Sequence, residues 1–190
     1  MTPVSRYHPV LVVLHWFLAL LIIATLVLGA FVLVKIPNAS PMKLKGLSSH
    51  MIGGMIILGL MLVRLVIRTR SAHPAVASAG HPLLDWLGWM SHRLFYVTVI
   101  VMAASGIVMA LQTGLFETVF FGHGQVPADF WIYPIRSVHY VLSRLLITLI
   151  ALHIVAAFYH ALVLRDGLFG RMFFGRRKIV QTSLLTRVQP

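Results

Sequence analysis

The chain has 190 residues, of which 59% are apolar and only 11% are charged, and its mean hydropathy is +0.91. A soluble domain carries about 25% charged residues, so this composition excludes a soluble globular protein and predicts an integral membrane protein. The sequence has no cysteine, which excludes disulfides, iron–sulfur clusters and thiolate catalysis.

Four apolar stretches follow one another, at residues 9–34, 47–67, 87–111 and 138–164. Each is at least as long as the ~20 residues that a helix needs to cross a bilayer core. Helices are expected because every backbone polar group must be satisfied internally in lipid. We therefore predict an all-α integral membrane four-helix bundle over residues 1–178, followed by a basic tail over 179–190.

The three links between these spans differ in length and composition. The first, KIPNASPMKLK, contains proline and lysine, and the second, RTRSAHPAVASAGHP, is marked by proline and glycine. The third link, residues 112–137, is the longest and carries Glu117 and Asp129.

Sixteen lysines and arginines against four acidic residues give a net charge of +12. Eleven cations lie on the side of the termini and five on the other side, which places both termini in the cytoplasm by the positive-inside rule. The basic GRRK motif is therefore interpreted as a topology signal rather than a nucleic-acid patch. The first apolar run is too long for a cleaved signal peptide and is expected to stay in the membrane.

Ten histidines are many for so apolar a chain. Four of them fall in links or before the first span and are interpreted as solvated: His8, His73, His81 and His123. Six lie within or at the ends of spans, where ionisable residues are costly and usually functional. These are His15, His50, His92, His139, His153 and His160.

The depths of these histidines predict two pairs. With the N-terminus inside, His15 lies in the cytoplasmic half of its span and His50 lies near the outer end of the next. His139 opens the fourth span on the outer side, and His153 follows it by fourteen residues, or roughly 21 Å, on nearly the same helix face. His15 can therefore meet His153, and His50 can meet His139.

Each pair can bring two imidazoles onto opposite sides of a flat macrocycle, as in a haem with both axial positions filled, which favours electron transfer. A zinc site is a competing interpretation, but zinc needs several ligands at one point. Structural or proton-relay histidines are a further alternative. Within the haem hypothesis, His92 could replace His15 or His153, and His160 could contact a propionate or a quinone head group.

Several basic residues have two interpretations each. Arg64 and Arg68 either mark topology or pair with a propionate of the inner haem. Arg144, further inside its span, must snorkel, face a polar cavity or pair, and an outer-haem propionate is one such partner. Lys43 and Lys45, just before His50, could attract an anion to the outer haem.

The sequence resembles the bacterial cytochrome b561 family over residues 5–178. The resembling segments are RYHPVLVVLHW, LKGLSSHMIGGMIILGLMLVRLVIR, WMSHRLFYVTVIVMAASGIVMA, SVHYVLSRLLITLIALHIVAAFYH and RDGLFGRMFFGRRK. The resemblance implies a multi-pass protein of the bacterial inner membrane with two b haems. It places their axial ligands at His15, His50, His139 and His153, the four residues that depth and helical phase also select.

The resemblance further implies electron exchange with the quinone pool, with ubiquinone as the electron acceptor and superoxide or a periplasmic redox protein as a candidate donor. A membrane-anchor subunit that relays electrons from a partner dehydrogenase is the alternative. A small transporter is disfavoured because the spans lack glycine- and proline-interrupted helices. The expected partners are membrane lipid and these redox partners. Nucleic acid is not expected to bind.

Overall fold

Four long helices make up most of the structure, a computed structural model that describes residues 4–75, 78–175 and 178. They are α1 (Pro9–Val27), α2 (Pro41–Arg70), α3 (Pro82–Gln112) and α5 (Pro134–Phe158). Each, with the helical turns that continue it, is long and apolar enough to cross a membrane. The prediction of an all-α bundle of four membrane helices is confirmed, whereas the orientation of its termini stays a prediction.

All four long helices begin at a proline. Proline suits the first helical turn because its missing N–H needs no partner there. In three of the four helices, the side chain before the proline accepts a hydrogen bond from a backbone N–H of the first turn. These residues are His8, Ser40 and His81. His8 and His81 thus act as helix caps from the links, and His81 is exposed, as expected for a link residue. The last three of these helices begin at 41, 82 and 134, earlier than the hydropathy boundaries of 47, 87 and 138.

Two of the membrane helices end in π-helical segments. α1 continues as η1 (Leu28–Val32) and a 3₁₀ turn, η2 (Leu33–Lys35), and α5 continues as η3 (Tyr159–Leu164). Short π-helical segments within α-helices are found frequently at functional sites. Here they carry Gly29 and His160.

The long third link contains a helix that hydropathy does not reveal. α4 (Leu115–Phe120) follows Gly114, whose φ of 67° is in the left-handed region that glycine adopts readily. This turn separates α4 from α3. At the other end of the molecule, the 3₁₀ helix η4 (Phe169–Met172) folds back toward α1, where the Trp16 indole N–H donates to the carbonyl of Met172 at 2.8 Å.

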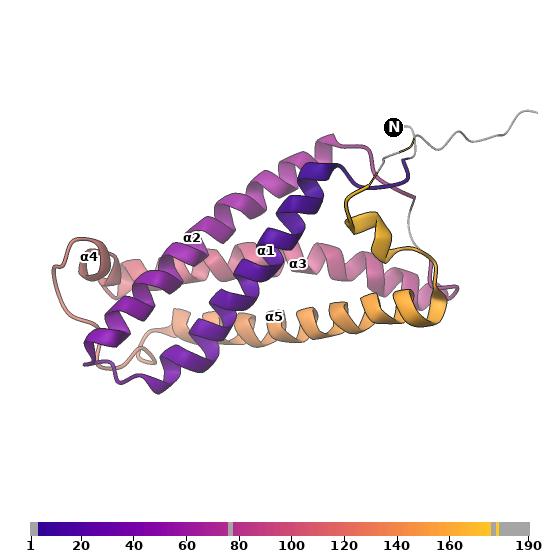
Figure 1. The fold of residues 1–190 in the computed structure, drawn as a ribbon. Coiled ribbons are helices and arrows are strands. Elements are labelled where there is room, and N and C mark those ends of the chain that lie inside the picture. Colours follow the sequence, from indigo (N-terminus) through magenta and orange to yellow (C-terminus); the bar gives the residue numbers. More distant parts are fainter. Residues whose placement is uncertain (1–3, 76–77, 176–177, 179–190) are drawn as a thin grey trace, which may run out of the picture.

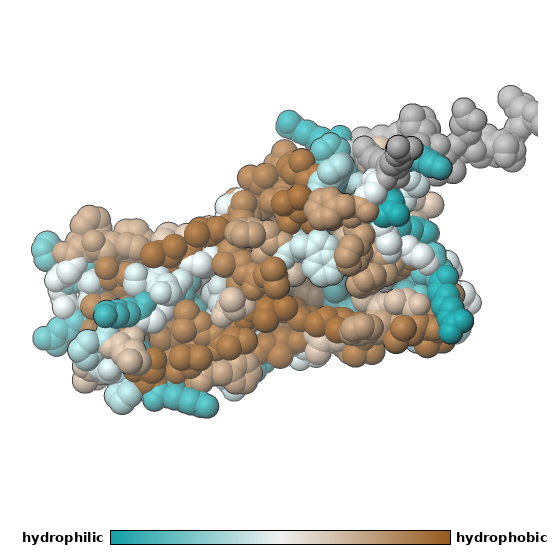
Figure 2. All heavy atoms as spheres, in the orientation of Figure 1, coloured by the Kyte–Doolittle hydropathy of each residue, from teal (hydrophilic) through white to brown (hydrophobic). Residues whose placement is uncertain are grey.

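The helices pack in the order α1–α2–α3–α5, and the α1–α2 pair crosses the α3–α5 pair obliquely (Figure 1). The buried core lies between them and consists of Leu18, Leu26, Ile57, Met61, Val99 and Leu146. Many apolar side chains point outward, such as Leu20 and Val141, which are 70% and 62% exposed. On the face drawn in Figure 2, apolar side chains cover the middle and polar ones gather at both ends. This distribution fits a bilayer, since lipid solvates the apolar middle.

The two ends of the bundle are tied by different contacts. At what we call the terminal end, Tyr7 contacts His73 of the α2–α3 link, with ring centroids 6.2 Å apart, and the Arg171 guanidinium donates to the carbonyl of Ala75 at 2.7 Å. At the loop end, the Asn38 amide donates to the carbonyl of Ala128 at 2.8 Å, joining the first and third links. The predicted basic tail over 179–190 and the two arginines of GRRK lie outside the described residues.

Candidate functional site

Four histidines meet in two pairs between the helices. The ring centroids of His15 on α1 and His153 on α5 lie 6.3 Å apart, with an interplanar angle of 69°. Those of His50 on α2 and His139 on α5 lie 6.2 Å apart, at 73°. The two predicted pairings are therefore present as contacts between side chains, one toward the terminal end and one toward the loop end.

Helix geometry explains why one helix serves both pairs. His139 and His153 are fourteen residues apart on α5, so their side chains project from nearly the same face. In the described part of the chain, α5 packs closely against α3, whereas its close backbone contacts with α1 and α2 are few at most. Each imidazole pair thus links two helices that do not pack closely along their backbones.

Two glycines leave room for the imidazoles of the loop-end pair. A Cβ atom added at Gly29 would lie 2.5 Å from Cε1 of His50, closer than carbon atoms can approach. A Cβ at Gly106 on α3 would lie 3.2 Å from Cε1 of His139, which is tighter than ordinary contact. The backbone approaches both rings so closely that only glycine fits without a shift.

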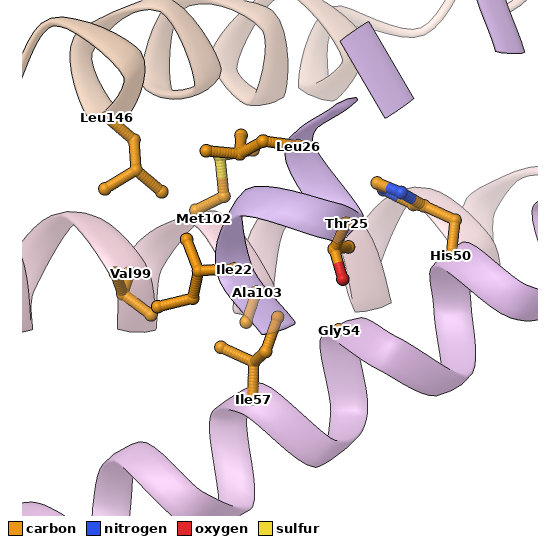
Figure 3. Close-up of a pocket in the computed structure, with 10 residues that line it drawn as sticks. All are labelled: Ile22, Thr25, Leu26, His50, Gly54, Ile57, Val99, Met102, Ala103 and Leu146. Atoms are coloured by element: carbon orange, nitrogen blue, oxygen red, sulfur yellow. The ribbon is translucent and has the colours of Figure 1, made fainter. Parts of the chain in front are cut away.

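The Nδ1 atoms of the loop-end pair have different surroundings. Nδ1 of His139 lies 2.9 Å from the Ser105 hydroxyl, which itself donates to the carbonyl of Met102 at 2.7 Å. Nδ1 of His50 is buried and has no hydrogen-bond partner among the described residues. His50 also borders an apolar cavity in the middle of the bundle, with Thr25 beside it and Leu146 at the opposite side (Figure 3).

His92, the rival ligand, lies close to the terminal-end pair. Its ring centroid is 5.6 Å from that of His153, nearer than His15 is. Phe95, one turn further along α3, also contacts the ring of His153, at 5.4 Å. His92 is more exposed than the four paired histidines. The structure therefore brings a third imidazole to this pair.

His160, the other rival ligand, is hydrogen-bonded to an acidic residue. Its Nδ1 lies 2.6 Å from a carboxylate oxygen of Asp166, just beyond η3. Although partial burial raises the pKa of Asp166, its hydrogen bonds with the Leu168 amide and His160 outweigh burial and lower this pKa. This pair anchors the turn after the last span.

Two arginines near the terminal end of α2 take different positions. Arg64 is buried, 8% exposed, and donates to the carbonyl of Leu11 at 2.6 Å, one helical turn before His15. Arg68 lies 6.0 Å from the ring of Tyr7 at the terminal end. Arg64 is therefore more than a surface topology signal.

At the loop end, Arg144 is exposed and lies over the ring of Tyr140, at 4.8 Å. It comes five residues after His139, on a different side of α5. This position supports the snorkelling interpretation of Arg144 and not the pairing with an outer-haem propionate.

The two lysines before His50 also differ. Lys43 is 7% exposed, and its ammonium donates to the carbonyls of Leu33 and Ile36 at 2.6 and 3.1 Å. Lys45, in contrast, is exposed. Lys43 therefore caps the end of the first span, and of the two lysines before His50 Lys45 is the exposed one.

The zinc interpretation finds no support in the described part of the chain. No group of three or more His, Cys, Asp or Glu side chains there is arranged to hold a metal ion. Structural zinc requires four ligands and catalytic zinc three. Paired imidazoles instead suit a cofactor that already supplies the other ligands of its metal.

Residues 6–175, nearly the whole chain, match the family of prokaryotic cytochrome b561. The chain belongs to this family. Members are multi-pass membrane cytochromes, so membership implies haem b as the cofactor and electron transfer as the function. The family resemblance and the membrane location expected from the sequence are both confirmed.

The paired histidines of this cytochrome b561 fit haem b. The ring centroids of the two pairs lie 6.3 and 6.2 Å apart, which leaves room for one metal ion between each pair, since a metal–imidazole bond is about 2 Å long. The unpartnered Nδ1 of His50, the two glycine clearances and the apolar cavity suit a flat apolar macrocycle between the helices.

Proposed function

We propose that this cytochrome b561 holds two b haems, each between two histidines. His15 and His153 would hold one toward the terminal end, and His50 and His139 would hold the other toward the loop end. The observation that carries the proposal is the meeting of four imidazoles as two pairs at two depths of one bundle. Bound haem supplies one-electron chemistry, and two axial histidines favour electron transfer over ligand binding.

The residues around the terminal-end pair support a charged cofactor there. Arg64 is buried one turn from His15, and its guanidinium has no carboxylate partner among the described residues. A buried charge in a membrane protein is costly without a counter-charge. A haem propionate would supply that counter-charge, so we propose Arg64 as its partner.

We further propose that electrons pass between the two faces of the membrane and exchange with the quinone pool, with ubiquinone as acceptor. A lipid-soluble quinone reaches a cofactor in the bundle from the bilayer itself. Superoxide is one candidate donor, because the exposed Lys45 near His50 can attract an anion to the loop end. Rapid mixing of the purified protein with superoxide and a quinone analogue tests this step. If superoxide reduces the haem no faster than superoxide dismutates spontaneously, superoxide is not the donor. A partner dehydrogenase would then be the source of electrons.

The haem content of single alanine variants tests the ligand assignment. Purified wild-type protein should contain two b haems per chain, with a reducible b-type absorption band. The variants His15→Ala, His50→Ala, His139→Ala and His153→Ala should each lose one of the two, because a single remaining imidazole holds haem weakly.

Two further histidines serve as controls in that experiment. His160→Ala should keep both haems, because this ring is paired with Asp166. His92→Ala should also keep both. If His92→Ala lost one haem while His15→Ala retained two, the terminal-end ligands would be His92 and His153. Absence of any b-type band in protein made with ample haem would reject the redox function.

A further inference from the structure

A serine on α3 touches one of the four proposed ligands. The Ser105 hydroxyl lies 2.9 Å from Nδ1 of His139 and donates to the carbonyl of Met102 at 2.7 Å. A serine hydroxyl has a single proton, and a carbonyl oxygen can only accept. That proton is engaged with Met102, so the hydroxyl oxygen must accept from an N–H at Nδ1 of His139.

This donor arrangement determines the tautomer of the imidazole. A neutral histidine carries a proton on one ring nitrogen, and the hydrogen bond made by that nitrogen decides which one. With its proton on Nδ1, His139 has a free lone pair on Nε2. That nitrogen is then available to bind a metal.

We propose that Ser105 is a positioning residue that holds His139 in the tautomer and orientation needed to bind the loop-end haem through Nε2. The proposal rests on the proposed haem ligation and adds a residue that acts through the ligand His139. Ser105 is 4% exposed, so water does not compete for this hydrogen bond. The next residue, Gly106, gives the same ring its clearance. Ser105 and Gly106 together thus hold the imidazole of His139 in place, one by a hydrogen bond and the other by leaving space for the ring.

The hydrogen bond between Ser105 and His139 should affect the reduction potential of one haem. A hydrogen bond accepted from Nδ1–H raises the basicity of an imidazole ligand, which favours ferric over ferrous iron. Ser105→Ala removes the hydroxyl acceptor and should therefore raise one of the two midpoint potentials and leave the other unchanged. Loss of one haem to a haem-scavenging apoprotein should become about 10-fold faster, at the low end of such effects. Ser105→Thr keeps a hydroxyl and should restore both properties.

Ser143→Ala is the matched control. Ser143 is also buried in a membrane helix and donates to the carbonyl three residues before it, Tyr140, at 2.7 Å, but it has no hydrogen bond with a histidine. Its removal should change neither potential. Equal shifts for the two alanine variants, or a threonine variant that behaves like Ser105→Ala, would overturn the proposal.

The haem assignment can fail independently of the serine. If His139→Ala retained both haems, the proposed function would be wrong at this ligand. If His139→Ala lost one haem while Ser105→Ala left both potentials and the rate of haem loss unchanged, only the role of Ser105 would be wrong.

Discussion

Single glycines control how closely the helix backbone approaches the imidazoles. In a helix interior, replacing glycine by alanine normally stabilises by about 1 kcal/mol, because alanine loses less conformational freedom. At Gly29 the opposite is expected, because the new Cβ would lie 2.5 Å from Cε1 of His50. That ring borders the cavity and cannot move without altering its orientation toward His139.

The variant Gly29→Ala should therefore lose the loop-end haem, or bind it at least tenfold more weakly, the range expected when a ligand is misoriented. Haem stoichiometry and redox titration of the purified protein measure this. Gly59→Ala on α2 is the matched control, since a Cβ there meets nothing within 4 Å. Two intact haems in both variants would show that the close approach at Gly29 is not needed to seat His50.

At the scale of elements, the join between the first two membrane helices depends on one buried lysine. The first span ends in π-helical and 3₁₀ turns, and the last carbonyls of a helix lack the full set of helical partners. The Leu33 carbonyl accepts from the Ile36 N–H at 3.3 Å. Lys43, from the start of α2, donates to two of these carbonyls, those of Leu33 and Ile36. A cation at a helix C-terminus also interacts favourably with the helix dipole.

Replacing Lys43 by methionine should destabilise the protein by about 1–3 kcal/mol, the usual cost of leaving buried hydrogen-bonding groups without partners. Thermal unfolding in detergent, followed by circular dichroism, gives the comparison. Lys45→Met should have little effect, because that side chain is exposed. Equal losses of stability in the two variants would contradict the capping role of Lys43.

At the scale of the whole molecule, the arrangement of cations predicts the orientation in the membrane. The terminal end gathers the N-terminal segment, the end of α2, the first part of α3 and the segment after η3. Together they hold seven of the nine arginines that the structure describes: Arg6, Arg64, Arg68, Arg70, Arg93, Arg165 and Arg171. The loop end holds fewer cations and the two acidic residues Glu117 and Asp129. By the positive-inside rule, the terminal end faces the cytoplasm.

Because the chain has no cysteine, single cysteines can report this orientation without background. Gln125→Cys at the loop end and Ala75→Cys at the terminal end both replace exposed side chains. A membrane-impermeant maleimide should label Gln125→Cys in intact cells, and Ala75→Cys only after the membrane is opened. The reverse pattern would place the termini outside.

Much of the fold was predictable from hydropathy, because a membrane span is a local property of about twenty consecutive residues. The helix starts were less accurate: the proline-marked segment before His50 was interpreted as a link, although Ser40 and Pro41 begin a helix there. The short helix α4 was missed because six residues carry too little periodicity to be recognised. The roles of Ser105 and Gly29 were missed as well, since a serine or a glycine in an apolar span has no distinctive pattern.

By itself, the sequence determined four membrane helices, their charge asymmetry and the depth and helical phase of each histidine, because these properties depend on consecutive residues of one chain segment. Only the tertiary structure decided that His92 also reaches His153, that Lys43 is a cap, that Arg64 is buried near His15 and that a hydroxyl faces Nδ1 of His139. These contacts join residues from different helices. They depend on how the helices cross and how far apart their backbones lie, which the pattern within a single helix does not encode.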